Sequence, residues 1–254
     1  MTNRTPDGPT PEAVRDRLDR VTDPELDRSI VELEYIDGIE IDVRTVTVHL
    51  TLPTAWCSPA FAWMMAVDSR TEVEELPAVE RARIYLHEHM HEIEINRGVN
   101  AGRSFPEAFP DAEDTVDAVR AELDRKARTA RQYDAVEALL EAGLEAETIV
   151  SLRPRDLERT DGDDRLSIYL SDRAVAVSVS AEPIDRYLEK ARETGLVDAD
   201  TDPLFLTPEG EPIDSGEFEL VHRRGRLAQV NMSSQGGICD GLRESRERRL
   251  EASD

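Results

Sequence analysis

The alternation of apolar and polar residues in the first third of the chain predicts a strand, a turn and a buried helix. Residues 44–52 alternate β-branched or apolar side chains with polar ones, the pattern of a half-buried strand. Pro53 ends this strand because proline has no N–H to donate to a sheet. Residues 59–67 are almost wholly apolar, and Ser58 and Pro59 stand where helices commonly begin.

Further elements follow on both sides of this segment. Residues 10–21 predict a helix with Thr10 as its N-cap and Pro11 in its first turn. Residues 34–42 pair with the strand as a hairpin, and the buried helix extends to about Leu76. A third strand is expected over residues 81–86. The order helix, strand, strand, helix, strand predicts an α+β fold, a small mixed sheet with helices on one face.

The pattern changes after residue 98. Residues 98–110 form a turn-rich connector that Phe105 and Phe109 should anchor. A charged helix from Asp114 to about Gln132 and a second helix ending at Gly143 predict a hinge. The predicted organisation is a disordered leader at 1–9, an α+β domain at 10–110, a helical linker at 111–132, and a mainly helical domain at 133–254 with a β-hairpin near 166–179.

The net charge of −24 argues against binding to nucleic acid, whose backbone is itself anionic. Lys126 and Lys190 are the only lysines, and the acidic residues are spread along the whole chain. That pattern is typical of a halophilic cytosol, where salt screens the self-repulsion. With no apolar run of membrane-spanning length and no N-terminal signal pattern, we expect a cytoplasmic protein without a membrane partner.

Cys57 is the best-placed thiol for chemistry. It lies directly before the predicted helix start at Ser58, where free N–H groups and the helix dipole favour thiolate, the form that binds metal. The alternative is that Cys57 is a small buried hydrophobe. With only two cysteines, far apart in sequence, the chain has no disulfide framework and no four-cysteine metal site of its own.

Three of the five histidines, His87, His89 and His91, fall within five residues. If the third strand continues through them, their imidazoles share one face of the sheet at a spacing of about 7 Å, and they could ligate a transition metal. The spacing is not that of the zinc-protease helix. The alternative is that they are solvated side chains at a strand end.

Cys239 lies in a glycine-rich stretch, residues 235–243, that predicts a turn before an arginine-rich final helix. Arg243 would favour its thiolate form. A site that bridges Cys57 and Cys239, with His87, His89 or His91 completing it, is one hypothesis. Nothing in the sequence itself brings the two thiols together.

Asp23, Pro24 and Glu25 form an Asp-Pro-Glu sequence ahead of the predicted hairpin, and Cys57 follows the hairpin in a loop. With this turn and this loop cysteine, which are the hallmarks of the family, the segment from Val14 to Ile95 resembles the SufT/PaaD-type iron–sulfur assembly family. The residues around Cys57 and a later Asn-Arg-Gly-Val-Asn stretch resemble a longer haloarchaeal and actinobacterial subgroup found with diiron monooxygenases.

The resemblance implies a factor for iron–sulfur cluster assembly that is not an enzyme. It would pass a transiently bound cluster to client metalloenzymes, with Cys57 as ligand and the Asp-Pro-Glu turn shaping its loop. Other iron–sulfur assembly proteins and a second copy of the chain are the further expected partners. Two alternatives stay open: an adaptor or regulatory protein whose cysteines bind nothing, and a histidine-dependent metalloenzyme.

The second half of the chain resembles, element by element, the catalytic framework of tyrosine recombinases. Glu145 stands where that family has its first catalytic arginine, and Asp240 stands where a histidine is expected. No tyrosine follows Arg243 to act as nucleophile. Attack on a phosphodiester needs both cations and an activated hydroxyl, so this half is either an inactive framework or a coincidence of short elements.

Overall fold

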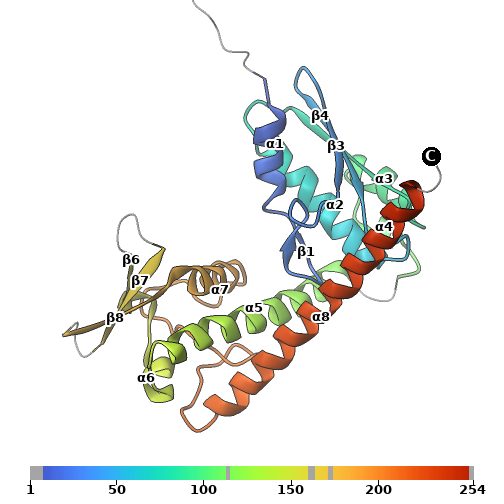
Figure 1. Cartoon of the computed structure of the whole chain (residues 1–254). Coiled ribbons are helices and arrows are strands. Elements are labelled where there is room, and N and C mark those ends of the chain that lie inside the picture. Colours follow the sequence, from blue (N-terminus) through green and yellow to red (C-terminus); the bar gives the residue numbers. More distant parts are fainter. Residues whose placement is uncertain (1–7, 113–114, 160–163, 171–173, 252–254) are drawn as a thin grey trace, which may run out of the picture. The chain divides into compact units, whose positions relative to one another are not determined.

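A computed structural model describes residues 8–112, 115–159, 164–170 and 174–251, without the side chains of residues 235–236, 238–240 and 242–251. The chain divides into two compact units (Figure 1). The first comprises Met1–Arg120 with Ser234–Asp254, and the second Ala121–Ser233. The domain boundaries at residues 110 and 132 stay a prediction, and residues 1–7 of the predicted leader lie outside the described part. No helix in the described ranges is both long and apolar enough to cross a membrane.

The first unit is a mixed sheet covered by helices. Its elements are α1 (Pro11–Leu18), β1 (Thr22–Asp23), β2 (Arg28–Ser29), β3 (Ile36–Asp42), β4 (Thr45–Thr51), α2 (Pro59–Glu74), β5 (Arg81–His87), α3 (Glu92–Asn100) and α4 (Phe105–Ala108). The main sheet has the order β3-β4-β5, in which β3 is antiparallel to β4 and β4 is parallel to β5. The α+β prediction is therefore confirmed.

Local sequence explains where these elements begin and end. The Thr10 hydroxyl accepts a hydrogen bond from the Ala13 N–H at 3.2 Å, so it caps α1 as predicted. The hairpin between β3 and β4 turns at Val43, whose φ is +57°. Gly143, with φ of +87°, follows the end of α5 (Val116–Glu141), where a left-handed residue commonly stops a helix.

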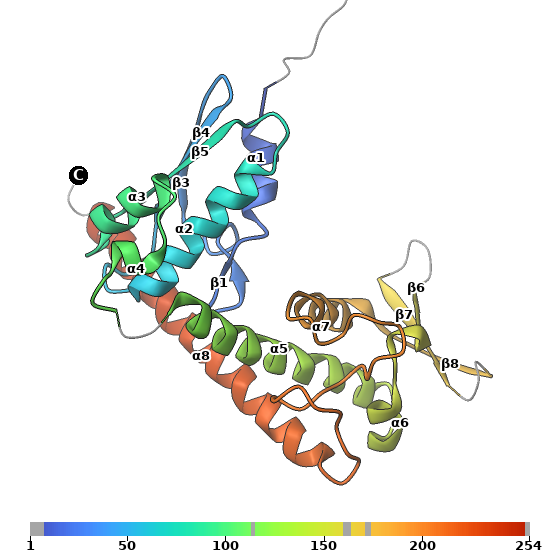
Figure 2. The ribbon, with the colours of Figure 1, turned by 180° about the vertical axis from the view of Figure 1, so that it is seen from behind.

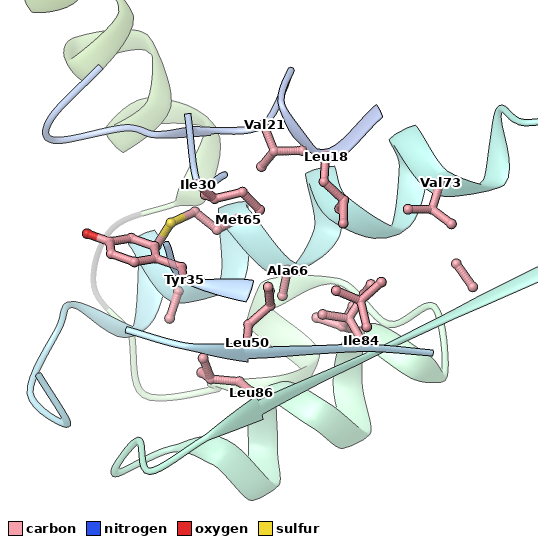
Figure 3. Close-up of a cluster of buried hydrophobic side chains, with 14 of the residues drawn as sticks. Leu18, Val21, Ile30, Tyr35, Leu50, Met65, Ala66, Val73, Ile84 and Leu86 are labelled. Atoms are coloured by element: carbon pink, nitrogen blue, oxygen red, sulfur yellow. The ribbon is translucent and has the colours of Figure 1, made fainter. Parts of the chain in front are cut away.

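One face of the sheet forms the core of the first unit. Alternate residues of β4 and of β5 are buried, among them Leu50, Ile84 and Leu86, because side chains of a strand alternate between its two faces. Figure 3 shows them facing Met65 and Ala66 of α2. α2 packs on this face of the sheet, chiefly against β5 (Figure 2).

Helix α3 protects the free edge of β5. The Asn96 side chain accepts from the Leu86 N–H at 2.7 Å and donates to the Leu86 carbonyl at 2.9 Å. One helical turn later, Asn100 makes the same pair of bonds to Ile84, at 2.9 and 2.7 Å. An unprotected edge strand would invite pairing with another chain, and these two amides occupy its donors and acceptors instead.

The second unit holds a small antiparallel sheet and helices. Its elements are α5 from Ala121 onward, α6 (Ala146–Ser151), η1 (Pro154–Asp156), β6 (Leu157–Arg159), β7 (Arg165–Leu170), β8 (Val175–Ser180), α7 (Ala181–Glu193) and the beginning of α8 (Phe218–Glu251). The predicted hairpin is confirmed as β7 and β8. The Gln132 amide holds the loop before α8 through two bonds to the backbone of Leu206, of 2.8 and 3.1 Å.

Two predicted breaks are wrong. α5 runs unbroken through Gln132, because no glycine or proline interrupts it there and its buried residues continue to Leu139. The glycine turn predicted over residues 235–243 lies inside α8. Isolated glycines cost a helix only about 1 kcal/mol each, which a helix as long as α8 tolerates.

Candidate functional site

Two loops meet at one end of the main sheet. The first follows β4 and carries Cys57; the second follows β5 and carries His89. Because β4 and β5 are parallel, their carboxyl ends lie at the same edge, where α/β proteins commonly bind ligands. The Met90 N–H donates to the Ala55 carbonyl at 3.1 Å, so the backbones of the two loops are joined directly.

Cys57 is a half-buried cysteine in the thiol form, one residue before Ser58, the N-cap of α2. The Ser58 hydroxyl makes no capping hydrogen bond, and the first turn of α2 contains no acidic residue. The positive end of the α2 dipole is therefore not neutralised by a carboxylate of its own first turn, and it favours negative charge nearby. The predicted position of Cys57 at a helix start is confirmed.

The predicted histidine strand is wrong. β5 ends at His87, Glu88 takes a left-handed φ of +54°, and His91 precedes the first residue of α3. That reversal at Glu88 breaks the two-residue alternation, so the three imidazoles do not share a sheet face.

His89 ties the two loops together. Its side chain is buried, Nε2 lies 2.9 Å from the Cys57 carbonyl oxygen, and Nδ1 lies 3.1 Å from the His91 amide nitrogen. A carbonyl only accepts and an amide N–H only donates, so the neutral tautomer carries its proton on Nε2. Since both ring nitrogens are occupied, His89 positions the Cys57 loop in this structure and leaves no nitrogen free for a metal.

His87 lies on the opposite, polar face of the sheet. Its Nε2 is 2.8 Å from Nδ1 of His49 on β4, and the two rings are stacked. His49 in turn stacks on Tyr85. Sequence reasoning did not consider His49, although the alternation of β4 places it on this face, where a neighbouring strand could bring a second histidine.

His91 lines a groove beside Cys57. The groove has a volume of about 580 Å³, and among the described residues it is lined by Ser58, Pro59, Ala60, His91, Glu94, Phe105, Ala108, Phe109, Pro110, Asp111, Ala112 and Val119. The His91 ring packs edge-on against Phe109 with centroids 5.5 Å apart. Phe105 and Phe109 pack on the core of the first unit, as the sequence predicted.

Asp23 organises the Asp-Pro-Glu turn. One carboxylate oxygen accepts from the N–H groups of Glu25 and Leu26 at 2.9 and 3.2 Å, and the other accepts from the Tyr35 hydroxyl at 3.1 Å. Pro24 stands inside this turn, between the paired strands β1 and β2. Burial raises the pKa of the Asp23 carboxyl above its ordinary value, although the three hydrogen bonds oppose the shift.

Two substitutions at Asp23 should distinguish what its hydrogen bonds contribute to stability from what its charge contributes. Asp23→Ala is expected to lower the free energy of unfolding by about 2–3 kcal/mol, because two backbone N–H groups lose their acceptor. Asp23→Asn keeps an acceptor and should cost less than about 1 kcal/mol. Urea denaturation of wild type, Asp23→Ala and Asp23→Asn measures both values.

The pH dependence provides a second test of Asp23. Because the folded state holds this proton more tightly, its contribution to stability is fully present below pH 3.8 and is lost as pH rises through the raised pKa. Asn does not titrate. The wild-type free energy of unfolding minus that of Asp23→Asn should therefore fall as pH rises from 3.8; a difference that rises with pH would contradict the buried-carboxyl account.

The described residues hold no group of three or more His, Cys, Asp or Glu side chains that could bind a metal ion. Cys239 lies within α8, and its side chain is outside the described part. Its predicted convergence with Cys57 stays a prediction. At the meeting of the two loops the described side chains include one thiol, so any metal or cluster bound there would need ligands beyond them.

Comparison with known proteins bears on the first unit. The model of a family described as "Iron-sulfur cluster assembly protein" matches residues 11–84, under a third of the chain, and the matched segment includes Asp23 and Cys57. It supports an iron–sulfur assembly domain there and a general role in iron–sulfur cluster assembly. No curated protein and no solved structure matches the chain. The longer subgroup and the recombinase-like second half stay predictions.

Proposed function

We propose that this chain is a non-enzymatic factor that passes iron–sulfur clusters to client metalloenzymes, with Cys57 as a transient ligand of the cargo. The observation that carries the proposal is the place of Cys57, a half-buried thiol at the start of α2 inside the segment that matches the assembly family. The matched family also supports interaction with other iron–sulfur proteins.

The chemistry of the site fits transfer better than storage. Iron–sulfur clusters are held by several thiolates, typically four, and Cys57 supplies one. The remaining ligands would come from a small thiol, a second copy of the chain, the donor or the client. A cluster held through one protein ligand leaves the other iron positions open to exchange with an acceptor.

The surroundings of Cys57 serve to present the thiol. His89 and Met90 fix the backbone of its loop through hydrogen bonds to Cys57 and Ala55. The start of α2, whose own first turn contains no acidic residue, favours the anionic, metal-binding form of sulfur. A fixed loop and a helix start beside the thiol are enough to present a metal ligand, and neither needs a general base or a bound substrate. Both features therefore suit a carrier.

Cluster transfer from the purified full chain tests the proposal. The chain is reconstituted anaerobically with ferrous iron, sulfide and glutathione, and transfer to an apo-ferredoxin is followed by visible circular dichroism. Cys57→Ser is expected to reduce the transfer rate at least tenfold, because serine is a poor ligand for iron in place of a thiolate. Its far-ultraviolet spectrum and urea midpoint should match wild type.

Cys239→Ser is the comparison variant. If Cys239→Ser transfers clusters at the wild-type rate, the function is assigned to Cys57 alone. If Cys239→Ser loses transfer as Cys57→Ser does, the result favours the site that bridges the two thiols. Undiminished transfer from Cys57→Ser, or no cluster bound by wild type, would sink the proposal and favour an adaptor that binds no metal.

A further inference from the structure

The groove beside Cys57 is built from several segments of the first unit. The start of α2 forms one side, His91 and Glu94 at the start of α3 form another, and Phe105 to Phe109 of the α4 region face them. Figure 2 shows α4 beside the start of α2. Ser58, the residue after Cys57, is part of the lining. A molecule in the groove would therefore lie next to the thiol.

The lining combines an apolar floor with negative charge. The rings of Phe105 and Phe109 are tilted by 31° with centroids 4.8 Å apart, and they line the groove together with alanine and proline side chains; Phe105 is buried beneath it and Phe109 is partly exposed. The charged side chains of the described lining are Glu94 and Asp111, both acidic. Apolar walls with a few polar groups are typical of binding pockets, and about 580 Å³ lies within their usual range.

Three large apolar side chains close in the chain to Cys57 or to groove residues are exposed, two on the joined loops and one in the first turn of α3. Trp56 is 76% exposed, Met90 55% and Ile93 61%. Each is a chain neighbour of Cys57 or of a groove residue, and the Ala55–Met90 hydrogen bond holds the two loops together. Large exposed apolar side chains scattered singly are ordinary, but a cluster of them at a groove marks an interaction surface.

We propose that the groove docks a short client segment whose apolar side chains are flanked by lysine or arginine. Apolar side chains of the segment would pack on Phe105 and Phe109, and its cations would face Glu94 and Asp111. This inference rests on the proposed function, since it seats the client next to Cys57. The strongly acidic chain would also attract such a cationic segment over longer range.

Peptide binding to the metal-free full chain tests the inference independently of cluster transfer. The probe is a fluorescein-labelled ten-residue peptide of leucine and phenylalanine flanked by arginines, compared with the same peptide carrying glutamates in their place. We expect saturable binding of the arginine peptide in fluorescence anisotropy, and at least tenfold weaker binding of the glutamate peptide. Raising the salt concentration from 0.1 to 1 M KCl should weaken the binding of the arginine peptide, because salt screens charge attraction.

Variants of the groove separate its contribution from general charge. Glu94→Arg with Asp111→Arg should weaken binding at least tenfold, and Ala112→Trp, at an exposed position of the lining, should block it. The control is Asp16→Arg with Asp42→Arg, which makes the same change of charge at exposed positions away from the groove. It should alter binding less than twofold.

Four results would overturn the docking proposal. They are equal binding of both peptides, no binding of either, an equal loss in the control variant, and a dimer in sedimentation that Ala112→Trp dissociates. The last would assign the groove to a second copy of the chain. Since no cluster is present, failure here leaves the Cys57 experiment unaffected, and loss of transfer in Cys57→Ser leaves peptide binding intact.

Discussion

Asn96→Leu is expected to lower the free energy of unfolding by about 3 kcal/mol and to make the chain prone to associate. The Asn96 amide occupies both the N–H and the carbonyl of Leu86, a residue that is 1% exposed. Leucine can replace neither bond, and each buried group left without a partner costs about 1–3 kcal/mol. The uncovered edge of β5 would then be open to pairing with another strand.

Urea denaturation and light scattering at rising protein concentration measure these two effects. Asn100→Leu should behave like Asn96→Leu, because Asn100 makes the same two bonds to Ile84. Arg97→Leu adds the same apolar side chain at an exposed position of α3 and should change stability by less than about 0.5 kcal/mol. Equal stability of Asn96→Leu and Arg97→Leu would refute the role of the amides.

Gly98→Ala is expected to destabilise the first unit by about 2 kcal/mol or more, typical of an overpacked core. This reverses the intrinsic preference, because alanine is a better helix former than glycine by about 1 kcal/mol. A Cβ at position 98 would lie 2.6 Å from Cζ3 of Trp63 and 3.1 Å from the Ala108 Cβ. Trp63 is itself buried in the core, so it has little room to withdraw.

A double-mutant cycle identifies Trp63 as the obstacle. Trp63→Phe removes ring atoms that the new methyl group would meet, so Gly98→Ala should cost at least 1 kcal/mol less in that background. Gly38→Ala is the control, since a Cβ there meets nothing within 4 Å. Additive effects of Gly98→Ala and Trp63→Phe would show that the clash is relieved in another way.

Strong local signals made much of the first unit predictable. The start of α1 is marked by Thr10 with Pro11, and the start of α2 by Ser58 with Pro59. The strand β4 is marked by its alternation of apolar and polar residues. The paired strands β1 and β2 could not be predicted, since each is two residues long and has no period to detect. Their turn depends on the Asp23 side chain, which the sequence marked only through a family resemblance.

Alternation misled the prediction at the end of β5. The run from His87 to Asn96 alternates as a strand would, but residues 92–100 form α3, with Ile95 and Val99 buried at helical spacing. Tertiary contacts decide between the two readings, because Asn96 and Asn100 reach the edge of β5 only from a helix. The Asn-Arg-Gly-Val-Asn stretch thus gains a physical meaning: two amides for the strand edge and one glycine for Trp63.

The candidate site was predictable in part. Cys57 and its helix start follow from sequence, whereas the groove requires α3 and α4 to be placed around α2. The position of His89 is likewise a tertiary result, since its partner Cys57 lies 32 residues earlier in the chain. Histidine spacing alone suggested a metal ligand where the structure has a brace between loops.

The side chain of His89 links the backbone of Cys57 to the start of α3. His89 holds the carbonyl of Cys57 with one nitrogen and the amide of His91 with the other. Because the imidazole ring of His89 is rigid, a displacement of the start of α3 would move the backbone of Cys57 with it. We therefore expect a molecule that binds at the start of α3 to shift the backbone of Cys57 without a large rearrangement of the fold.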